Sequence, residues 1–441
     1  MSRLPGLEDG RLRNLESLTR GPLARALQAL NGDGEETRLV GGAVRDLILG
    51  LKAEDLDLAT TARPDEVIRR AGTAGFKVAT PGLSHGTVTL IMDGRTIETT
   101  TLREDVETDG RHARVAFGRD FPTDARRRDF TINALSLSPD GRVHDPVGGL
   151  DDLAVRRVRF IGDADDRIRE DYLRILRFFR FSARFGEGAV DAEGLRAAVR
   201  NRLAIVNLSR ERVRAEILKL IVAPHAGAVV ETMGESGILQ PALGFAYSGR
   251  FNRAIAIETA RGAKTDALLR LAALAAMILE DAERLREKLR LANAEYERIA
   301  SAANALAGLH GTRTPPPADH LRVLLFSAGR QAARDALFLA EADSGASPDD
   351  PAFASSDRFL SETPAPELPL SGSDLIARGV EEGPRVGEVL RRFRQVWVEA
   401  GFPSDPDALD RLVKTAIETP RPSGSDGSSS PDSLKLRGRA S

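Results

Sequence analysis

The sequence predicts an α+β protein, with a small mixed-sheet domain followed by an all-helical region. Strand-like alternation of apolar and polar residues, together with Asp-Gly turns, is confined to residues 1–150. From about Leu150 to residue 418 these patterns stop, and Ala, Leu, Arg and Glu recur at helical spacing. A length of 441 residues exceeds one ordinary compact domain, so several domains are expected.

Five elements are expected in the first part of the mixed-sheet domain. They are a helix over 21–30, a strand over 37–40, a helix over 43–50, a strand over 54–60 and a helix over 64–72. Pro64 suits the first turn of the last helix, because its missing N–H costs no hydrogen bond there. The alternation of polar and apolar residues in 54–60 is typical of a strand.

Two strand pairs complete the domain. Residues 87–103 contain two strand patterns joined by Asp93-Gly94, which is a strong hairpin signal. Residues 129–149 hold a second pair with another Asp-Gly turn. Between the pairs, residues 103–118 are polar and have no helical stripe, so we expect a mobile loop there.

The rest of the chain is expected to be helical up to a disordered end. Breaks rich in proline and glycine divide it into a neck (151–225), a body (226–340), a tail (341–420) and a terminal segment (421–441). The terminal segment is rich in Ser, Gly and Pro, so it cannot form a core. Residues 169–185 have the pattern of one continuous helix.

Composition excludes several classes of function. The chain has no cysteine, which excludes disulfides and cysteine-based zinc sites. The net charge of −2 gives no global field for nucleic acid, although arginines cluster locally. The N-terminus lacks the apolar stretch of a secretory signal, and no apolar run is long enough to span a bilayer. We therefore expect a cytoplasmic protein with no membrane partner.

The segment LVGGAVRDLILGLKAEDLDLAT (39–60) combines features of a phosphate site and a metal site. Gly41 and Gly42 let the backbone approach a ligand closely, and the helix that follows directs N–H groups toward an anion. Arg45 would add a charged donor to the same site. Most Gly-Gly pairs are only turns, so this signal is weak on its own.

Paired carboxylates follow the glycines. In strand geometry Asp55 and Asp57 point to the same side, an arrangement that suits a divalent cation such as Mg²⁺ between them. Glu98 in the neighbouring hairpin is a candidate third carboxylate. Alone, an Asp-x-Asp pair is more often solvated surface than a metal site. The combination within one βαβ-sized unit makes the functional and the structural interpretations about equally well supported.

Two later groups of charged residues have simple structural explanations. The arginines of RRRDFTINAL (126–135) could form a solvated basic turn. Asp171 and Arg174, in EDYLRILR (170–177), could form a surface ion pair worth little energy. On these residues alone, the structural explanations are the simpler ones.

Together, however, these motifs resemble those of a known family. The first segment is similar to the head-domain signature of the nucleotidyltransferase superfamily that includes DNA polymerase beta, in its tRNA nucleotidyltransferase branch, which also contains bacterial poly(A) polymerases. The signature matches at Gly41, Gly42, Val44, Arg45, Asp46, Asp55 and Asp57. RRDFTINA (127–134) and EDYLRILR resemble the ribose-contacting and nucleotide-selecting motifs of the same family.

The resemblance implies a role for each matched residue. Asp55 and Asp57 would bind catalytic Mg²⁺, with Glu98 as a further catalytic carboxylate. The nucleotide-binding residues would be Gly41, Gly42, Arg45, Arg128, Asp129, Asn133, Asp171, Arg174 and Arg177. A carboxylate at Asp171 accepts from an exocyclic amine and a guanidinium at Arg174 donates to a ring nitrogen, which would admit CTP and ATP and reject UTP and GTP.

The function that follows is template-independent addition of CCA to the 3′ end of tRNA, with CTP and ATP as substrates. The helical body and the tail (341–420) would hold the acceptor arm of tRNA through its phosphates, using arginines such as those of NRLAIVNLSRERVR (201–214). The alternatives are a bacterial poly(A) polymerase, an enzyme that adds only CC or only A, and a non-catalytic RNA-binding relative. PGLSHGTVTL (81–90) stands where the poly(A) branch carries a basic element, which favours the CCA branch.

Overall fold

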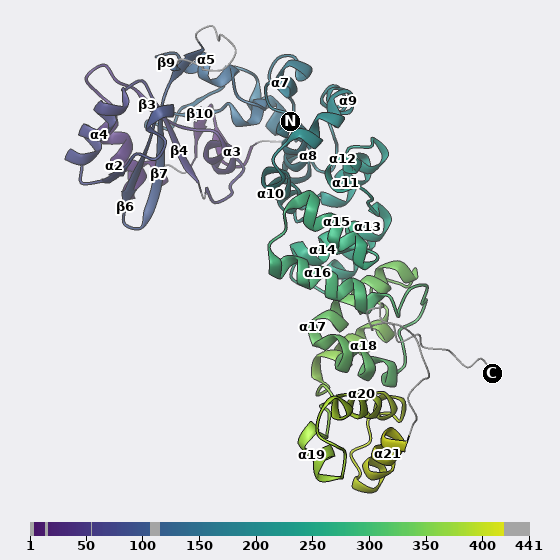
Figure 1. Cartoon of the computed structure of the whole chain (residues 1–441). Coiled ribbons are helices and arrows are strands. Elements are labelled where there is room, and N and C mark those ends of the chain that lie inside the picture. Colours follow the sequence, from purple (N-terminus) through teal and green to yellow (C-terminus); the bar gives the residue numbers. More distant parts are fainter. Residues whose placement is uncertain (1–3, 14–15, 54, 106–114, 419–441) are drawn as a thin grey trace. The chain divides into compact units, whose positions relative to one another are not determined.

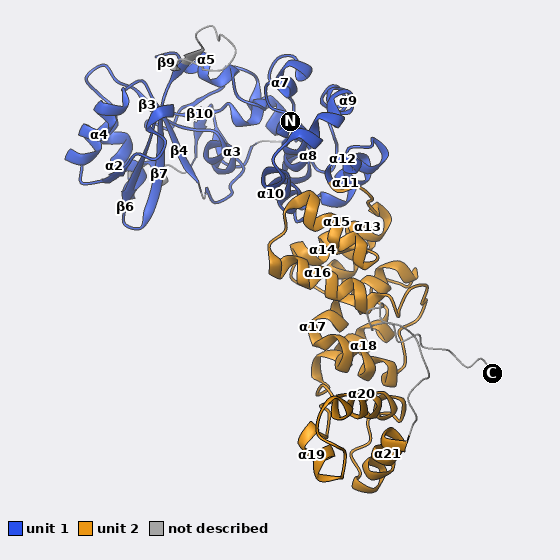
Figure 2. Cartoon of the chain, viewed as in Figure 1, with its two compact units in different colours: residues 1–242 blue, residues 243–441 orange. Residues whose placement is uncertain are grey.

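The computed structural model describes residues 4–13, 16–53, 55–105 and 115–418 (Figure 1). These residues form two compact units, residues 1–242 and 243–441, which are described separately (Figure 2). The predicted α+β class is confirmed, because a mixed sheet precedes a long series of helices. The boundary between the units falls inside the predicted body, and the division into head, neck, body and tail stays a prediction.

The first unit is built on a seven-stranded mixed sheet with the order β11-β10-β3-β4-β7-β6-β5. Its strands are β3 (Thr37–Val40), β4 (Leu56–Thr60), β5 (Lys77–Ala79), β6 (Thr87–Met92), β7 (Arg95–Thr101), β10 (Ser136–Leu137) and β11 (Val143–His144). Only the central β4–β7 pair is parallel; all other neighbours are antiparallel. The hairpin β6–β7 turns at Asp93 and Gly94, which both have positive φ as the sequence predicts.

Short elements surround this sheet. They are β1 (Leu7–Glu8), β2 (Arg11–Leu12), α1 (Glu16–Thr19), α2 (Gly21–Leu30), α3 (Gly42–Ile48), α4 (Pro64–Thr73), η1 (Leu83–His85), β8 (Arg103–Asp105), β9 (Val115–Phe117), α5 (Phe121–Arg126) and η2 (Thr131–Asn133). Helix α4 begins at Pro64, as expected. The predicted loop over 103–118 is wrong at both ends, because β8 and β9 pair there; its centre, 106–114, lies outside the described residues.

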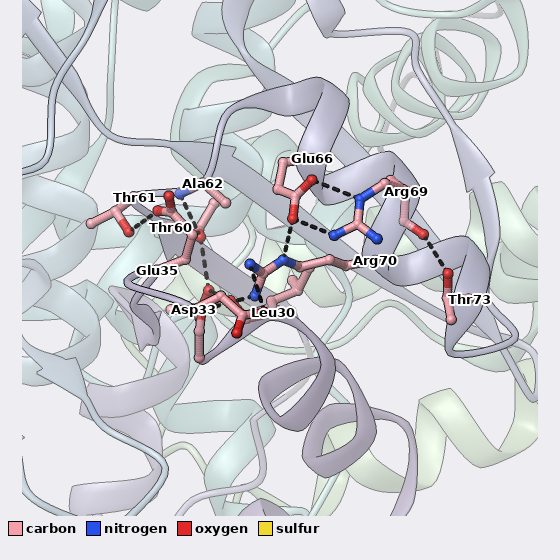
Figure 3. Close-up of polar contacts among 12 residues, drawn as sticks. Leu30, Asp33, Glu35, Thr60, Thr61, Ala62, Glu66, Arg69, Arg70 and Thr73 are labelled. Atoms are coloured by element: carbon pink, nitrogen blue, oxygen red, sulfur yellow. Dashed lines mark hydrogen bonds and ion pairs between the residues drawn. The ribbon is translucent and has the colours of Figure 1, made fainter.

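Polar contacts connect the end of β4 to β3, and connect α4 to the loop that follows α2 (Figure 3). Thr60 and Thr37 share a hydrogen bond of 2.7 Å across β3 and β4. On α4, hydrogen bonds from Arg69 and then Arg70 lower the pKa of Glu66 to about 2. Arg70 also donates to the carbonyl of Gly32 at 3.0 Å. The contact between Thr37 and Thr60 fixes the end of β4 that lies away from Asp57.

The helices of the first unit pack around aromatic side chains. They are α6 (Gly149–Ala154), α7 (Ala164–Glu170), α8 (Leu173–Phe185), α9 (Ala192–Asn201), η3 (Arg202–Asn207), α10 (Arg210–Ile221), α11 (Ala226–Glu235) and α12 (Leu239–Leu243). Phe130, which follows the arginine-rich turn, lies 5.2 Å from Phe181 of α8 between ring centroids. Phe178 of the same helix lies 5.2 Å from Phe160. This aromatic packing joins the mixed-sheet domain to α8.

The helix predicted over residues 169–185 is broken. Helix α7 ends at Glu170, and Asp171 is extended with φ −156° and ψ 107°. Helix α8 then starts at Leu173, whose N–H donates to Asp171 Oδ1 at 3.1 Å. The side chain of Asp171 therefore satisfies one of the free N–H groups at the start of α8, which makes the break favourable without proline or glycine.

In the second unit, every element of regular secondary structure among the described residues is a helix. Its helices are α13 (Ser248–Ala260), α14 (Ala267–Ala275), α15 (Leu279–Leu289), α16 (Asn293–Leu306), α17 (Ala318–Ser344), α18 (Pro351–Glu362), α19 (Gly372–Ala377), α20 (Pro384–Glu399) and α21 (Pro406–Glu418). Phe393 and Trp397 of α20 belong to a buried apolar cluster that also contains Leu375 and Val413. The predicted disordered end, 421–441, lies outside the described residues. In the described part of the chain, no helix is long and apolar enough to cross a membrane.

One buried carboxyl in this unit predicts a pH dependence of stability. Glu341 is 1% exposed, and burial raises its pKa to about 7 although Arg261 Nη2 lies 2.6 Å from its Oε1. Between an unfolded pKa near 4.5 and the folded value, the native state binds more protons. Stability contributed by this group is therefore lost as pH rises through that window, by up to about 3 kcal/mol.

Glu341→Gln should remove this dependence, because the amide oxygen still accepts from Arg261 and carries no charge. We expect the variant to have a higher melting temperature than the wild type at pH 8. Its melting temperature should also change less than that of the wild type between pH 5 and 7. Glu362→Gln, at an exposed glutamate of α18, is the matched control. Identical pH profiles for wild type and Glu341→Gln would contradict the assignment.

Candidate active site

The central strands bring the predicted carboxylates together. Asp57 on β4 is paired in register with Val40 of β3 and with Glu98 of β7. Because neighbouring residues of paired strands face the same side, Asp57 and Glu98 share one face of the sheet. Asp55 lies just before β4, which starts at Leu56 rather than at residue 54.

The electrostatics of Asp57 reflect this arrangement. Burial of its carboxyl raises the pKa above the ordinary value, and the negative charges of Glu98 and Asp55 raise it further. The positive charge of Arg128 acts in the other direction and lowers the pKa of Asp57. The side chain nonetheless keeps an exposed surface, so a ligand has access to it. Three mutually repelling carboxylates and one guanidinium therefore converge on one exposed position, where a cation relieves the repulsion.

The glycine turn lies against the same arginine. Gly41 ends β3 with φ 70° and ψ −131°, and its N–H donates to the Leu135 carbonyl at 3.0 Å. A Cβ on Gly41 would stand 2.8 Å from Arg128 Nη1. Arg128 is held there by Asp124, at 3.2 Å, and by the Asn133 carbonyl, at 3.3 Å. A glycine backbone, a fixed guanidinium and the Asp57 carboxylate are thus gathered at one place.

Replacing Gly41 by alanine should destabilise the protein, because both the left-handed φ and the contact with Arg128 penalise a side chain. Strain of this kind costs about 1–3 kcal/mol. Gly42 is the matched control: it is helical, and its Cβ would lie 3.4 Å from Arg45 Nη2, an ordinary contact. Urea denaturation should show a clearly lower free energy of unfolding for Gly41→Ala and little change in that free energy for Gly42→Ala. Equal stability of the two variants would contradict the strain assigned to Gly41.

Arg45 occupies an interior position. It is 5% exposed, donates from Nε to Asp46 at 2.9 Å and from Nη1 to Asn133 at 2.5 Å. Its guanidinium also lies 4.0 Å from the ring centroid of Phe185, on α8. In the structure Arg45 therefore links α3 to η2 and α8. A direct contact between Arg45 and a nucleotide stays a prediction.

Asp129 and Arg177 form the main ionic contact between the mixed-sheet domain and α8. Arg177 donates to Asp129 Oδ2 through Nε at 2.8 Å and through Nη2 at 2.6 Å. The other oxygen, Oδ1, accepts from the Asn133 side chain at 3.0 Å and from the Phe130 N–H at 2.9 Å. These bonds satisfy both oxygens of a buried carboxylate, and they place three predicted nucleotide-binding residues in one network.

Asp171 and Arg174 have separate ionic partners. Asp171 Oδ2 accepts from Arg212 Nη2 of α10 at 2.6 Å. Arg174 pairs with Glu170 and donates to the Arg167 carbonyl at 2.8 Å. The surface ion pair between Asp171 and Arg174 that the sequence allowed is therefore not how either side chain is held.

Sequence reasoning missed two residues that support this site. Asp124 is buried and holds Arg128, while Arg212 holds Asp171. The sequence offered no sign of either contact. Asp124 lies one helical turn before Arg128 and outside the motif, and Arg212 lies 41 residues after Asp171. Arg212 belongs to the arginine run that we had expected to contact only tRNA phosphates.

The donor set fits a divalent cation bound with retained water. In the described part of the chain, no group of three or more His, Asp or Glu side chains is arranged as a closed metal site. Magnesium is usually bound by one or two carboxylates, waters and substrate phosphates rather than by a full protein cage. Asp55 and Asp57, facing solvent beside Gly41 and Arg128, have this open character.

A mixed sheet with carboxylates on its central strands, beside a glycine turn, defines a nucleotidyltransferase head followed by helices. Residues 37–159 match the family model of the poly A polymerase head domain, and residues 189–245 match that of a probable RNA- and SrmB-binding site of polymerase A. The members of this family generally use divalent metal ions.

Similar proteins and solved structures show which branch of this family the chain resembles. The mouse mitochondrial CCA tRNA nucleotidyltransferase 1 is 31% identical over 392 residues, covering 87% of each chain. The zebrafish protein of the same name is 43% identical over 231 residues, 52% of this chain and 54% of its own length. A crystal structure of the Bacillus stearothermophilus CCA-adding enzyme in complex with CTP is 27% identical, with a TM-score of 0.63 over 88% of this chain and 95% of that one. The chain belongs to the family of CCA tRNA nucleotidyltransferases.

Proposed function

We propose that this protein adds CCA to the 3′ end of tRNA, using CTP and ATP without a nucleic-acid template. The 3′-hydroxyl of tRNA attacks the α-phosphate of the nucleotide and loses its proton. A new ester bond forms to the α-phosphorus, the bond to the β-phosphate breaks, and pyrophosphate leaves. The observation that carries the proposal is the pairing of Asp57 with Glu98 beside Gly41 and Arg128, in a chain of this family.

Asp55 and Asp57 would hold Mg²⁺. When bound, the ions would stabilise the attacking and leaving oxygens of an in-line displacement. The protein's own contribution is positional: β4 presents Asp57, and Arg128 places a fixed positive charge where a triphosphate would lie. Glu98 raises the local negative charge and so favours cation binding.

Asp171 and Arg174 would select the base. Arg212 holds the side chain of Asp171, whose carboxyl oxygens would accept from the exocyclic amine of cytosine or adenine. Arg174 is within one turn of it and can donate to a ring nitrogen. Uracil and guanine present the opposite polarity at these edges and would be rejected. Asp129 and Arg177 would orient the ribose and the base relative to the head.

Arginines of residues 201–214 would bind the tRNA backbone, since phosphate contacts position RNA without reading sequence. The alternatives are polyadenylation, addition of CC or A alone, and RNA binding without catalysis. A cytoplasmic location stays a prediction, because the vertebrate relatives named above are mitochondrial.

The test is pyrophosphate release. Purified protein, Mg²⁺, CTP and a tRNA transcript that ends before CCA should release pyrophosphate in amounts that match the nucleotides incorporated. Omitting tRNA or replacing CTP by UTP should reduce the signal to background. A protein that binds the transcript but releases no pyrophosphate would be a non-catalytic relative.

A further inference from the structure

Large apolar side chains are unusually exposed on η3. Leu203 and Val206 are 70% and 63% exposed. They stand among the four most exposed large apolar side chains of the described residues, together with Val155 and Phe245. Single exposed apolar residues are common, but two on one turn form a patch that water solvates poorly.

The geometry of η3 aligns these two side chains. A 3₁₀-helix has three residues per turn, so side chains at i and i+3 are eclipsed. Leu203 and Val206 have this spacing, whereas Ile205 between them is buried, 2% exposed, and anchors the turn to the core. The result is a small apolar surface on a fixed backbone.

The helices on either side of this turn, α9 and α10, contact residues at the start of α7 and just after its end. On the N-terminal side, Asn201 Nδ2 donates to Asp165 Oδ1 at 2.8 Å, and Arg200 pairs with the same carboxylate. On the C-terminal side, Arg212 Nη2 donates to Asp171 Oδ2 at 2.6 Å. The apolar turn therefore lies in a segment that is tied to Asp165 before it and to the nucleotide-selecting Asp171 after it.

Cationic residues flank the same turn. Arg202 precedes Leu203, and Arg210 and Arg212 follow Val206 within six residues. Arg202 is oriented by its hydrogen bond to the Val199 carbonyl, at 2.6 Å. A flat apolar surface between guanidinium groups matches the end of an RNA base stack, which offers an apolar face bordered by phosphates.

We propose that Leu203 and Val206 form a seat for the last base stack of the tRNA acceptor end, next to the position where the incoming nucleotide is selected. This inference rests on the proposed function, since it assigns the surface to the substrate of that reaction. The seat would hold the primer end at a fixed distance from Asp171. It would contribute to tRNA affinity and not to binding of CTP.

The test compares Leu203→Ser, Val206→Ser and the double variant with the wild type in steady-state CMP addition. Because both side chains are exposed, the variants should fold normally. We expect the double variant to raise the KM for tRNA about tenfold, equivalent to about 1.4 kcal/mol, with an unchanged KM for CTP. A minihelix that contains only the acceptor arm should show the same loss, and Leu203→Phe should keep the wild-type KM. Val155→Ser, at a residue 68% exposed outside the 189–245 segment, is the control.

Several results would overturn the proposal. They are an unchanged KM for tRNA in the double variant, an equal effect of Val155→Ser, or a loss with full tRNA that the minihelix does not show. An unchanged KM with altered sedimentation would assign the surface to a second copy of the chain instead. Failure of the proposed function would look different, because the wild type itself would then transfer no CMP.

Discussion

Asp57→Ala should abolish nucleotide incorporation while leaving tRNA binding nearly intact, and Asp55→Ala should do the same. Asp57 is paired in register with Glu98 and faces solvent beside Arg128, so its loss removes a cation ligand without disturbing the core. Losing electrostatic stabilisation of this kind costs about a thousandfold in rate, or about 4 kcal/mol. Single-turnover incorporation of labelled CMP measures the effect, and filter binding of labelled tRNA measures the affinity.

Asp65→Ala provides the matched control, because this exposed aspartate on α4 lies in the same domain. It should retain wild-type incorporation. Normal turnover by either Asp55→Ala or Asp57→Ala would contradict the assignment of the two carboxylates to catalytic metals. A parallel loss of tRNA affinity would mean that the carboxylates support the fold rather than the chemistry.

Replacing Asp171 or Arg174 by alanine should reduce discrimination against UTP and GTP about ten- to a hundredfold. Each variant removes one hydrogen bond between a charged group and the base, worth roughly 1.5–3 kcal/mol. In the structure each side chain is held by a partner other than its neighbour in the motif, so the two residues are not paired with each other. The measurement is kcat/KM for all four nucleotides on a tRNA that ends before CCA.

Arg169→Ala is the control for charge near this site, because Arg169 is exposed and pairs with Asp166. It should leave selectivity unchanged. If both Asp171→Ala and Arg174→Ala also kept wild-type selectivity and were only slightly destabilised, the two residues would be surface ion-pairing groups. The family assignment would then rest on the head and the relatives alone.

The sequence predicted most strands of the sheet because the determining signals are local, whereas the roles of the candidate site residues stay predictions. The alternation of polar and apolar residues predicted β4, and the Asp-Gly dipeptide predicted the turn between β6 and β7. Both residues of that turn have positive φ. Once these strands pair, register brings Glu98 beside Asp57. That pairing of β4 with β7 is parallel and long-range, so the sequence suggested the proximity without specifying it.

What the sequence could not show depends on partners far along the chain. The break at Asp171 has no proline or glycine to signal it, and Arg212 on α10 holds the aspartate in place. Arg45 was expected to face a phosphate, yet Asn133, 88 residues later, accepts its hydrogen bond in the interior. Periodicity reports on one helix at a time, and it carries no information about such distant ionic partners.

The most direct measurement of the central claim is nucleotide addition to three tRNA transcripts that end before CCA, after the first C and after CC. Each is incubated with each labelled nucleotide in turn. We predict that the first two accept only CMP, that the third accepts only AMP, and that addition then stops. Runs of AMP on all three transcripts would indicate a poly(A) polymerase, and addition at only one or two of the three positions would indicate a specialist enzyme. Either result would contradict the account.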